Sequence, residues 1–231
     1  MRARAFAWTL LAPALASAQP DGGAWLHYEV AGVHAVDREA SIDSPDQLVL
    51  AGFRLHGFYG RRVAAHIGVD LAAGSTIGQG GFAYDVALFP VGLALRLGDT
   101  GLVALGVGVG ASGAVGTLDD AATFPLELTT ELGAGPVRVL ARARAVYVRG
   151  ADARRDGAPS TSLADELEAT LGIRIGRHER AFGFDSGNGY FAGVTYRELG
   201  GARFAGLVIG YSIDSASPRR SRRDDMYVGA R

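Results

Sequence analysis

Two histidines and an aspartate in one predicted hairpin are the residues closest to a catalytic or metal-binding set. His56 and His66 flank a predicted turn at Gly60-Arg61-Arg62, and Asp70 follows on the same strand face. A three-residue turn would set the two imidazoles directly opposite each other, with the carboxylate one layer further on. Such a set can bind a metal ion or move protons. The alternative, that the three polar groups hydrogen-bond to one another inside the fold, is favoured because no nucleophile elbow, HExxH or phosphate loop accompanies them.

The second candidate is a literal GxGxxG at Gly108, Gly110 and Gly113, within the uncharged stretch 100–118. A dinucleotide site needs a helix directly after the glycines, and Gly116 and Pro125 leave too little room for one. Six glycines also make the stretch a poor membrane helix, since each costs about 1 kcal/mol relative to alanine. The remaining interpretation is a strand whose glycines line one face and give room to bulky neighbours.

The elements that would position these residues are strands, because apolar and polar residues alternate with a period of two along most of the chain. No window keeps a helical period for three turns, which predicts an all-β fold. The expected strands are 24–36, 47–59, 62–74, 82–97, 101–115, 123–133, 136–149, 163–176, 189–199 and 202–213. Pro90 interrupts the alternation of the fourth strand and predicts a β-bulge there.

Turn lengths suggest how the strands are joined. Tight turns fall near Gly60, at 98–100 and at 134–135, whereas longer polar loops fall at 37–46, 74–81, 116–122 and 150–162. Short turns on one rim and longer loops on the other are typical of an antiparallel up-and-down transmembrane barrel. The segments 177–188 and 200–201 break this alternation, so eight strands is the alternative to ten.

The N-terminus has the pattern of a secretory signal peptide. Arg2 and Arg4 precede the uncharged segment 5–15, and Ala16-Ser17-Ala18 forms a small-x-small cleavage site. The predicted organisation is a signal peptide at 1–18, a barrel at 19–213 and a basic, disordered periplasmic tail at 214–231.

Composition excludes several classes of function. The formal net charge of −1 provides no field for nucleic acid, and the absence of cysteine excludes disulfides and thiolate metal sites.

The apolar strand face carries almost no charge, apart from Asp165 and Glu198 near strand ends, and has tyrosines toward its edges. These features favour a lipid-facing exterior over a soluble barrel with the two faces inverted.

With its signal peptide and alternating strands, the chain resembles the small outer-membrane β-barrel proteins of Gram-negative bacteria. The resemblance covers residues 24–213 and is clearest in the final hairpin, YFAGVTYRELGGARFAGLVIGYSI at 190–213. It implies a location in the outer membrane, contact with its lipid and insertion by the barrel-assembly machinery. Such proteins usually end on an aromatic residue, whereas here SASPRRSRRDDMYVGAR follows Asp214.

The polar face is expected to fill the lumen with a charge network. A two-residue loop at Ala134-Gly135 would pair Glu131 with Arg138 and Glu127 with Arg142, and the next strand would let its carboxylates share arginines. The predicted network consists of Glu127, Glu131, Arg138, Arg142, Arg144, Glu166, Glu168 and Arg174. Eight to ten strands leave an interior that side chains nearly fill.

The sequence therefore predicts an integral outer-membrane barrel with a structural, surface-exposed or narrow-pore role, and neither a catalytic residue nor a cofactor or metal site. Two alternatives remain open. One is a membrane-embedded hydrolase using the His56/His66 region, and the other is a soluble periplasmic ligand-binding barrel.

Overall fold

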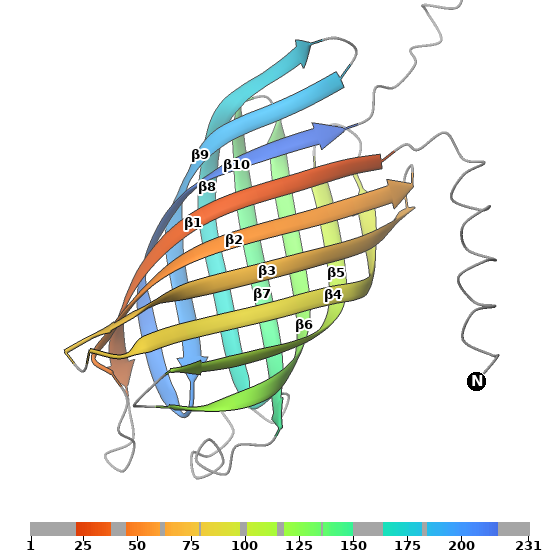
Figure 1. The fold of residues 1–231 in the computed structure, drawn as a ribbon. Helices are drawn as coiled ribbons and strands as arrows, with labels where there is room; N and C mark the ends of the chain where they lie inside the picture. Colours follow the sequence, from red (N-terminus) through yellow and green to blue (C-terminus); the bar gives the residue numbers. More distant parts are fainter. Residues whose placement is uncertain are drawn as a thin grey trace, which may run out of the picture.

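The computed structural model describes residues 22–37, 45–60, 63–78, 80–97, 101–114, 118–134, 136–149, 164–181 and 184–216. These residues form ten strands that close into one barrel (Figure 1). The strands are β1 (Gly22–Asp37), β2 (Gln47–Gly60), β3 (Val63–Ile77), β4 (Phe82–Arg96), β5 (Gly101–Ala114), β6 (Leu118–Ala134), β7 (Val137–Arg149), β8 (Glu166–Ala181), β9 (Phe184–Leu199) and β10 (Ala202–Ala216).

Every strand pairs antiparallel with its neighbours in the sequence, and β1 closes the barrel by pairing with β10. This confirms the predicted fold class and the count of ten strands. Both ends of the described chain lie at one rim, together with the β2–β3, β4–β5, β6–β7 and β8–β9 turns, and we call it the hairpin rim. The opposite end is the loop rim. Within the described residues no α-helix is long and apolar enough to cross a membrane.

Three strand ends lie five residues from their predicted positions. β6 begins at Leu118, so most of the predicted loop 116–122 is strand, and at the rim its Asp120 accepts a hydrogen bond from Tyr84 Oη at 2.7 Å. β8 and β9 extend to Ala181 and from Phe184, which removes the long connection expected at 177–188. This hairpin projects beyond the rest of its rim (Figure 1). Polar residues continue these strands because ladder hydrogen bonds need only the backbone.

The predicted bulge at Pro90 is confirmed. On β5, Val109 pairs with Leu88 and Val107 pairs with Val91, so Phe89 and Pro90 together oppose one residue. Proline has no N–H to donate to the ladder, so the extra residue is placed where a ladder hydrogen bond would be missing anyway.

The two faces of the wall have opposite chemistry. Large apolar side chains such as Val107, Leu171 and Ile209 are exposed on the outside, whereas arginines and carboxylates are buried in the lumen. Tyr147 lies toward the end of β7 on the outer face, whereas Tyr190, which the sequence placed at a strand end, lies near the middle of β9 because that strand begins at Phe184. A soluble barrel would need the reverse arrangement, so the exterior is of the outer-membrane type.

The predicted signal peptide at 1–18 lies outside the described residues. The same holds for the predicted tail beyond residue 216, and β10 runs three residues past the predicted barrel end at 213.

Candidate functional site in the barrel lumen

The lumen is stacked in layers from one rim to the other. On β1 the inward side chains read Trp25, Glu29 and Val33, and on β2 they read Phe58, Arg54 and Leu50. The apolar residue nearer the hairpin rim belongs to one buried cluster and the one nearer the loop rim to another. The charged residues therefore lie between two apolar layers.

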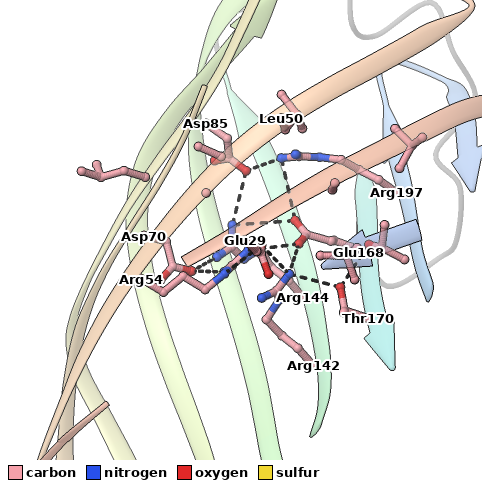
Figure 2. A pocket seen from close by; sticks show the side chains of 17 residues that line it. Glu29, Leu50, Arg54, Asp70, Asp85, Arg142, Arg144, Glu168, Thr170 and Arg197 are labelled. Atoms are coloured by element: carbon pink, nitrogen blue, oxygen red, sulfur yellow. Dashed lines mark hydrogen bonds and ion pairs between the residues drawn. The ribbon is translucent and has the colours of Figure 1, made fainter. Parts of the chain in front are cut away.

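We call the charged level the central charge layer. Its members contact one another through ion pairs across the lumen (Figure 2). They are Glu29, Arg54, Asp70, Asp85, Glu127, Arg142, Arg144, Glu168 and Arg197.

Arg144 on β7 is paired with four carboxylates of the layer, as is Arg54 on β2. Arg144 Nη2 lies 2.7 Å from Glu127 Oε2 and also donates to Asp70, and its Nη1 lies 3.3 Å from Asp85 Oδ2. The guanidinium carbon is 5.5 Å from the ring centroid of Phe89. Glu127 and Arg144 are only 2% and 3% exposed in their side chains. Five planar donors allow one arginine to satisfy carboxylates from three strands at once.

Arg54 and Arg142 complete the centre of the layer. Arg54 Nη2 lies 2.9 Å from Glu29 Oε1 and 3.4 Å from Glu168 Oε1, and Arg54 also donates to Asp70. Arg142 Nη2 donates to Glu168 Oε1 at 2.8 Å and to Thr170 Oγ1 at 3.1 Å. Each buried charge thus has oppositely charged neighbours, as burial requires.

The predicted register of β6 and β7 is wrong by two residues. Ala134 pairs with Val137, so the loop is Gly135-Pro136 and the residue facing Glu127 is Arg144, not Arg142. Proline in the turn explains the difference, because its fixed φ suits a turn and it cannot donate to the ladder. A shift of two keeps the side-chain faces and changes the partners.

The other predicted network residues lie closer to the rims. Glu131 faces Leu140 rather than Arg138, yet Arg138 Nη1 reaches its Oε1 diagonally at 3.0 Å. Arg174 Nη2 also lies 2.6 Å from Glu131 Oε1. Glu166 accepts a hydrogen bond from Gly200 N at 3.0 Å. This carboxylate therefore holds the β9–β10 turn where the β8–β9 ladder ends at Glu168 and Arg197.

Sequence reasoning did not assign Glu29, Arg54, Asp70, Asp85 or Arg197 to the network. The alternation did place three of them, Arg54, Asp70 and Asp85, on the inward-facing side of their strands. The alternation did not identify Glu29 as a lumenal charge, because the inward face of β1 also carries the apolar residues Trp25 and Val33. Its partners Arg54 and Arg142 lie on different strands, and no local pattern reports such contacts.

The histidine pair lies between the charge layer and the hairpin-rim apolar cluster. His56 Nδ1 is 2.8 Å from His66 Nε2, and His56 Nε2 is 2.8 Å from Asp70 Oδ1. The predicted facing of the two rings is wrong, because His56 pairs with Gly68 and His66 with Phe58. The rings meet diagonally and stack at 4.9 Å between centroids.

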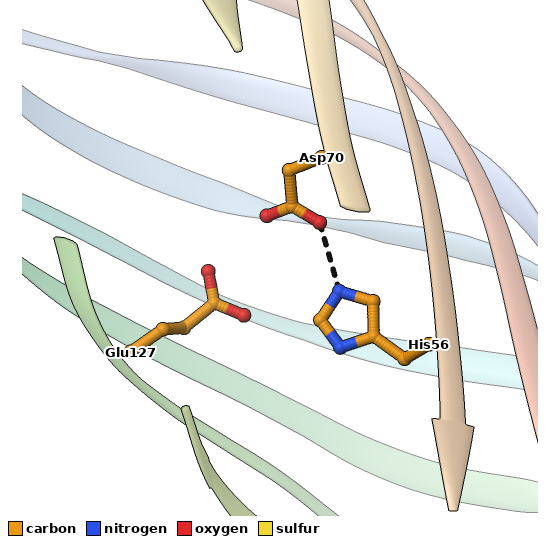
Figure 3. A group of neighbouring side chains, drawn as sticks. All are labelled: His56, Asp70 and Glu127. Atoms are coloured by element: carbon orange, nitrogen blue, oxygen red, sulfur yellow. Dashed lines mark hydrogen bonds and ion pairs between the residues drawn. The ribbon is translucent and has the colours of Figure 1, made fainter. Parts of the chain in front are cut away.

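These side chains include a geometric candidate for a metal site. Ligand atoms of His56, Asp70 and Glu127 all lie within 4.8 Å of one another (Figure 3). Arg144 Nη2, however, already bridges the two carboxylates. A guanidinium at this position supplies the positive charge that a metal ion would bring, so the donor set does not favour a metal.

Glycines explain how the lumen accommodates its rings. A Cβ on Gly106 would lie 3.0 Å from Phe89 Cδ1 and 3.2 Å from His66 Cε1, and one on Gly172 would lie 2.4 Å from Phe191 Cε2. The glycine-rich face of β5 therefore gives room to side chains from neighbouring strands. A cavity of about 30 Å³ lies in the charge layer, which is room for about two water molecules.

No protein-family model matches this chain, and no curated protein matches its sequence. Among solved structures, the chain is similar to the beta domain of the Bordetella autotransporter Brka at 13% identity and a TM-score of 0.39, over 85% of this chain and 99% of that chain. It is also similar to a bacterial polysaccharide outer membrane secretin at 11% identity and a TM-score of 0.23, over 83% and 98% of the two chains. These likenesses are weak, and the fold assignment rests on the closed strand order.

Proposed function

We propose that this protein is an integral outer-membrane β-barrel whose lumen is a solid, ion-paired core, and that its role is structural or surface-exposed. The observation that carries the proposal is the inverted distribution of side chains. Val107 is 55% exposed and Tyr190 is 76% exposed on the outside, while nine charged groups are held inside. An apolar exterior of this extent is unfavourable for a monomer in water but favourable in contact with lipid.

A non-conducting barrel is favoured over a narrow pore. The charge layer is flanked by apolar clusters that include Phe58 and Phe191 on one side and Leu48 and Phe204 on the other. An ion crossing the lumen would have to separate several buried ion pairs and pass two apolar constrictions, each of which opposes hydrated ions.

The hydrolase alternative has less support. His56 and His66 are 1% and 2% exposed, and their ring nitrogens contact each other and Asp70 and not a hydroxyl nucleophile within the part of the chain that the structure describes. A substrate would need to pass the apolar cluster or the charge layer to reach them.

The proposal is tested by membrane fractionation of expressing cells. The protein should remain in the outer-membrane pellet after carbonate extraction and should migrate differently on gels before and after boiling, because closed barrels resist unfolding in detergent. Release by carbonate without detergent would contradict the membrane proposal. The outer-membrane lipid and the barrel-assembly machinery are the partners that this proposal implies.

A further inference from the structure

The ion pairs of the central charge layer join strands that are far apart in the sheet. Arg54 on β2 lies 3.6 Å from Glu127 on β6, and Arg144 on β7 lies 3.3 Å from Asp85 on β4. Asp85 is also paired with Arg197 on β9. These contacts cross the lumen and are not ladder neighbours.

The charges are divided unequally between two half-sheets. Strands β1–β4 contribute three carboxylates and one guanidinium, namely Glu29, Asp70, Asp85 and Arg54. Strands β6–β9 contribute two carboxylates and three guanidinium groups, namely Glu127, Glu168, Arg142, Arg144 and Arg197. The strands between the halves, β5 and β10, contribute none to the layer, and β5 carries no charged residue at all. Within the layer, the group from β1–β4 is therefore net acidic and the group from β6–β9 is net basic.

These contacts depend on closure. In a flat sheet opened at the β1–β10 seam, β4 and β9 would be five strand spacings apart, or roughly 24 Å. That exceeds the distance of about 8 Å over which charges act in physiological salt. Asp85 and Arg197 can therefore meet only when the sheet curls.

Stability alone does not explain the layer. A buried ion pair is often no more stabilising than well-packed apolar residues of similar volume. The lumen already has two apolar clusters, so a third apolar layer would serve equally well. Unlike apolar residues, the charges specify which strands meet across the lumen.

We propose that attraction between the acidic layer residues of β1–β4 and the basic layer residues of β6–β9 drives the last stage of the curling, once the two groups lie within about 8 Å of each other, and so brings β1 to β10. The charge layer is then a closure device, and its buried ion pairs are the end state of that step. This inference rests on the proposed membrane barrel and concerns how the barrel closes.

The experiment measures closure of the full chain on dilution from urea into vesicles of short-chain phosphatidylcholine. Closed barrels are counted over time by the gel mobility of unboiled samples. Asp85→Asn is the main variant, because Asp85 on β4 forms ion pairs across the lumen with Arg144 on β7 and Arg197 on β9. Arg197→Gln removes the opposite partner. We expect each to slow closure on the order of tenfold, equivalent to about 1.4 kcal/mol.

The matched control is Arg138→Gln, which removes an ion pair between the adjacent strands β6 and β7, to Glu131. Its closure rate should remain near that of the wild type. Raising NaCl should slow wild-type closure and have a smaller effect on Asp85→Asn.

A wild-type closure rate that does not depend on salt would overturn the inference. It would also be overturned if Asp85→Asn and Arg197→Gln both closed at the wild-type rate and only opened faster. Either result would leave the membrane proposal intact. If the wild-type chain never entered the vesicles, the proposed function would fail as well.

Discussion

At the scale of single residues, the lumen combines large rings with glycines and arginines with shared carboxylates. His66 lies against Gly92 and Gly106, and Phe191 lies against Gly172. Neither kind of contact tolerates a change of size or charge, because the interior is close-packed and nearly dry. Substitutions in the lumen should therefore be costly although no reaction occurs there.

The pairing of Glu127 with Arg144 gives the first prediction. Each single change, Glu127→Gln or Arg144→Gln, should lower the free energy of unfolding of the detergent-solubilised barrel by about 3–5 kcal/mol, because it leaves the partner's charge buried and less well paired. The double variant should lose less than the sum of the two. The losses from Glu127→Gln and Arg142→Gln should come closer to additive, since Glu127 is paired with Arg144 whereas Arg142 is paired with Glu168. A stronger coupling of Glu127 to Arg142 than to Arg144 would instead support the register expected from the sequence.

The glycine contacts give the second prediction. Gly172→Ala should destabilise the barrel by about 1–3 kcal/mol, because the new Cβ would overlap Phe191 and the Ala192 carbonyl. Gly32→Ala is the matched control, since nothing lies within 4 Å of its Cβ position. Thermal unfolding followed by gel mobility compares the two. Equal transition temperatures would mean that the rings are not packed as described.

Chelation gives a third prediction at this scale. Incubation with EDTA should leave the unfolding temperature unchanged, because Arg144 occupies the position between Asp70 and Glu127. A metal retained in stoichiometric amount through purification, and a transition temperature that falls when it is removed, would argue for a metal site instead.

At the scale of the strands, alternation decides which face meets lipid, and turn chemistry decides which residues meet each other. β5 illustrates the first point, since Val107 and Val109 are exposed while Gly106 and Gly108 are buried. β6 and β7 illustrate the second, since a turn at Gly135-Pro136 replaces one at Ala134-Gly135 and moves every pair by two.

The exposed face of β5 gives the fourth prediction. Val107→Arg should block membrane assembly, because a charge at the lipid-facing midplane costs about 2–4 kcal/mol, whereas Val107→Ile should assemble normally. The yield of heat-modifiable protein in the outer-membrane fraction measures both. Gly108→Ser would not be a suitable control on the inner face of β5, because the new Cβ would lie 2.9 Å from Pro125 Cγ. Normal insertion of Val107→Arg would mean that the two faces are assigned the wrong way round.

At the scale of the whole molecule, the barrel is a closed wall around a packed interior. The lumenal cavity of about 30 Å³ is far too small for a solute to pass. The wild-type protein should therefore show no steady conductance in planar lipid bilayers. Discrete, reproducible channel openings would contradict the filled lumen and favour the narrow-pore role.

The sequence by itself determined most of the strands and the chemistry of the two faces, because a period of two is a local property that each strand carries independently. It left eight strands as an alternative to the ten that the structure shows. It also placed charges such as Glu127, Arg144 and Glu168 on the inward parity. Only the tertiary structure decided which charges meet. Glu29 reaches Arg142 and Asp85 reaches Arg197 because the sheet is tilted, sheared and closed, and these quantities depend on all ten registers together. A two-residue error in one hairpin leaves every face correct and every pair wrong, so partners across a lumen cannot be read from alternation.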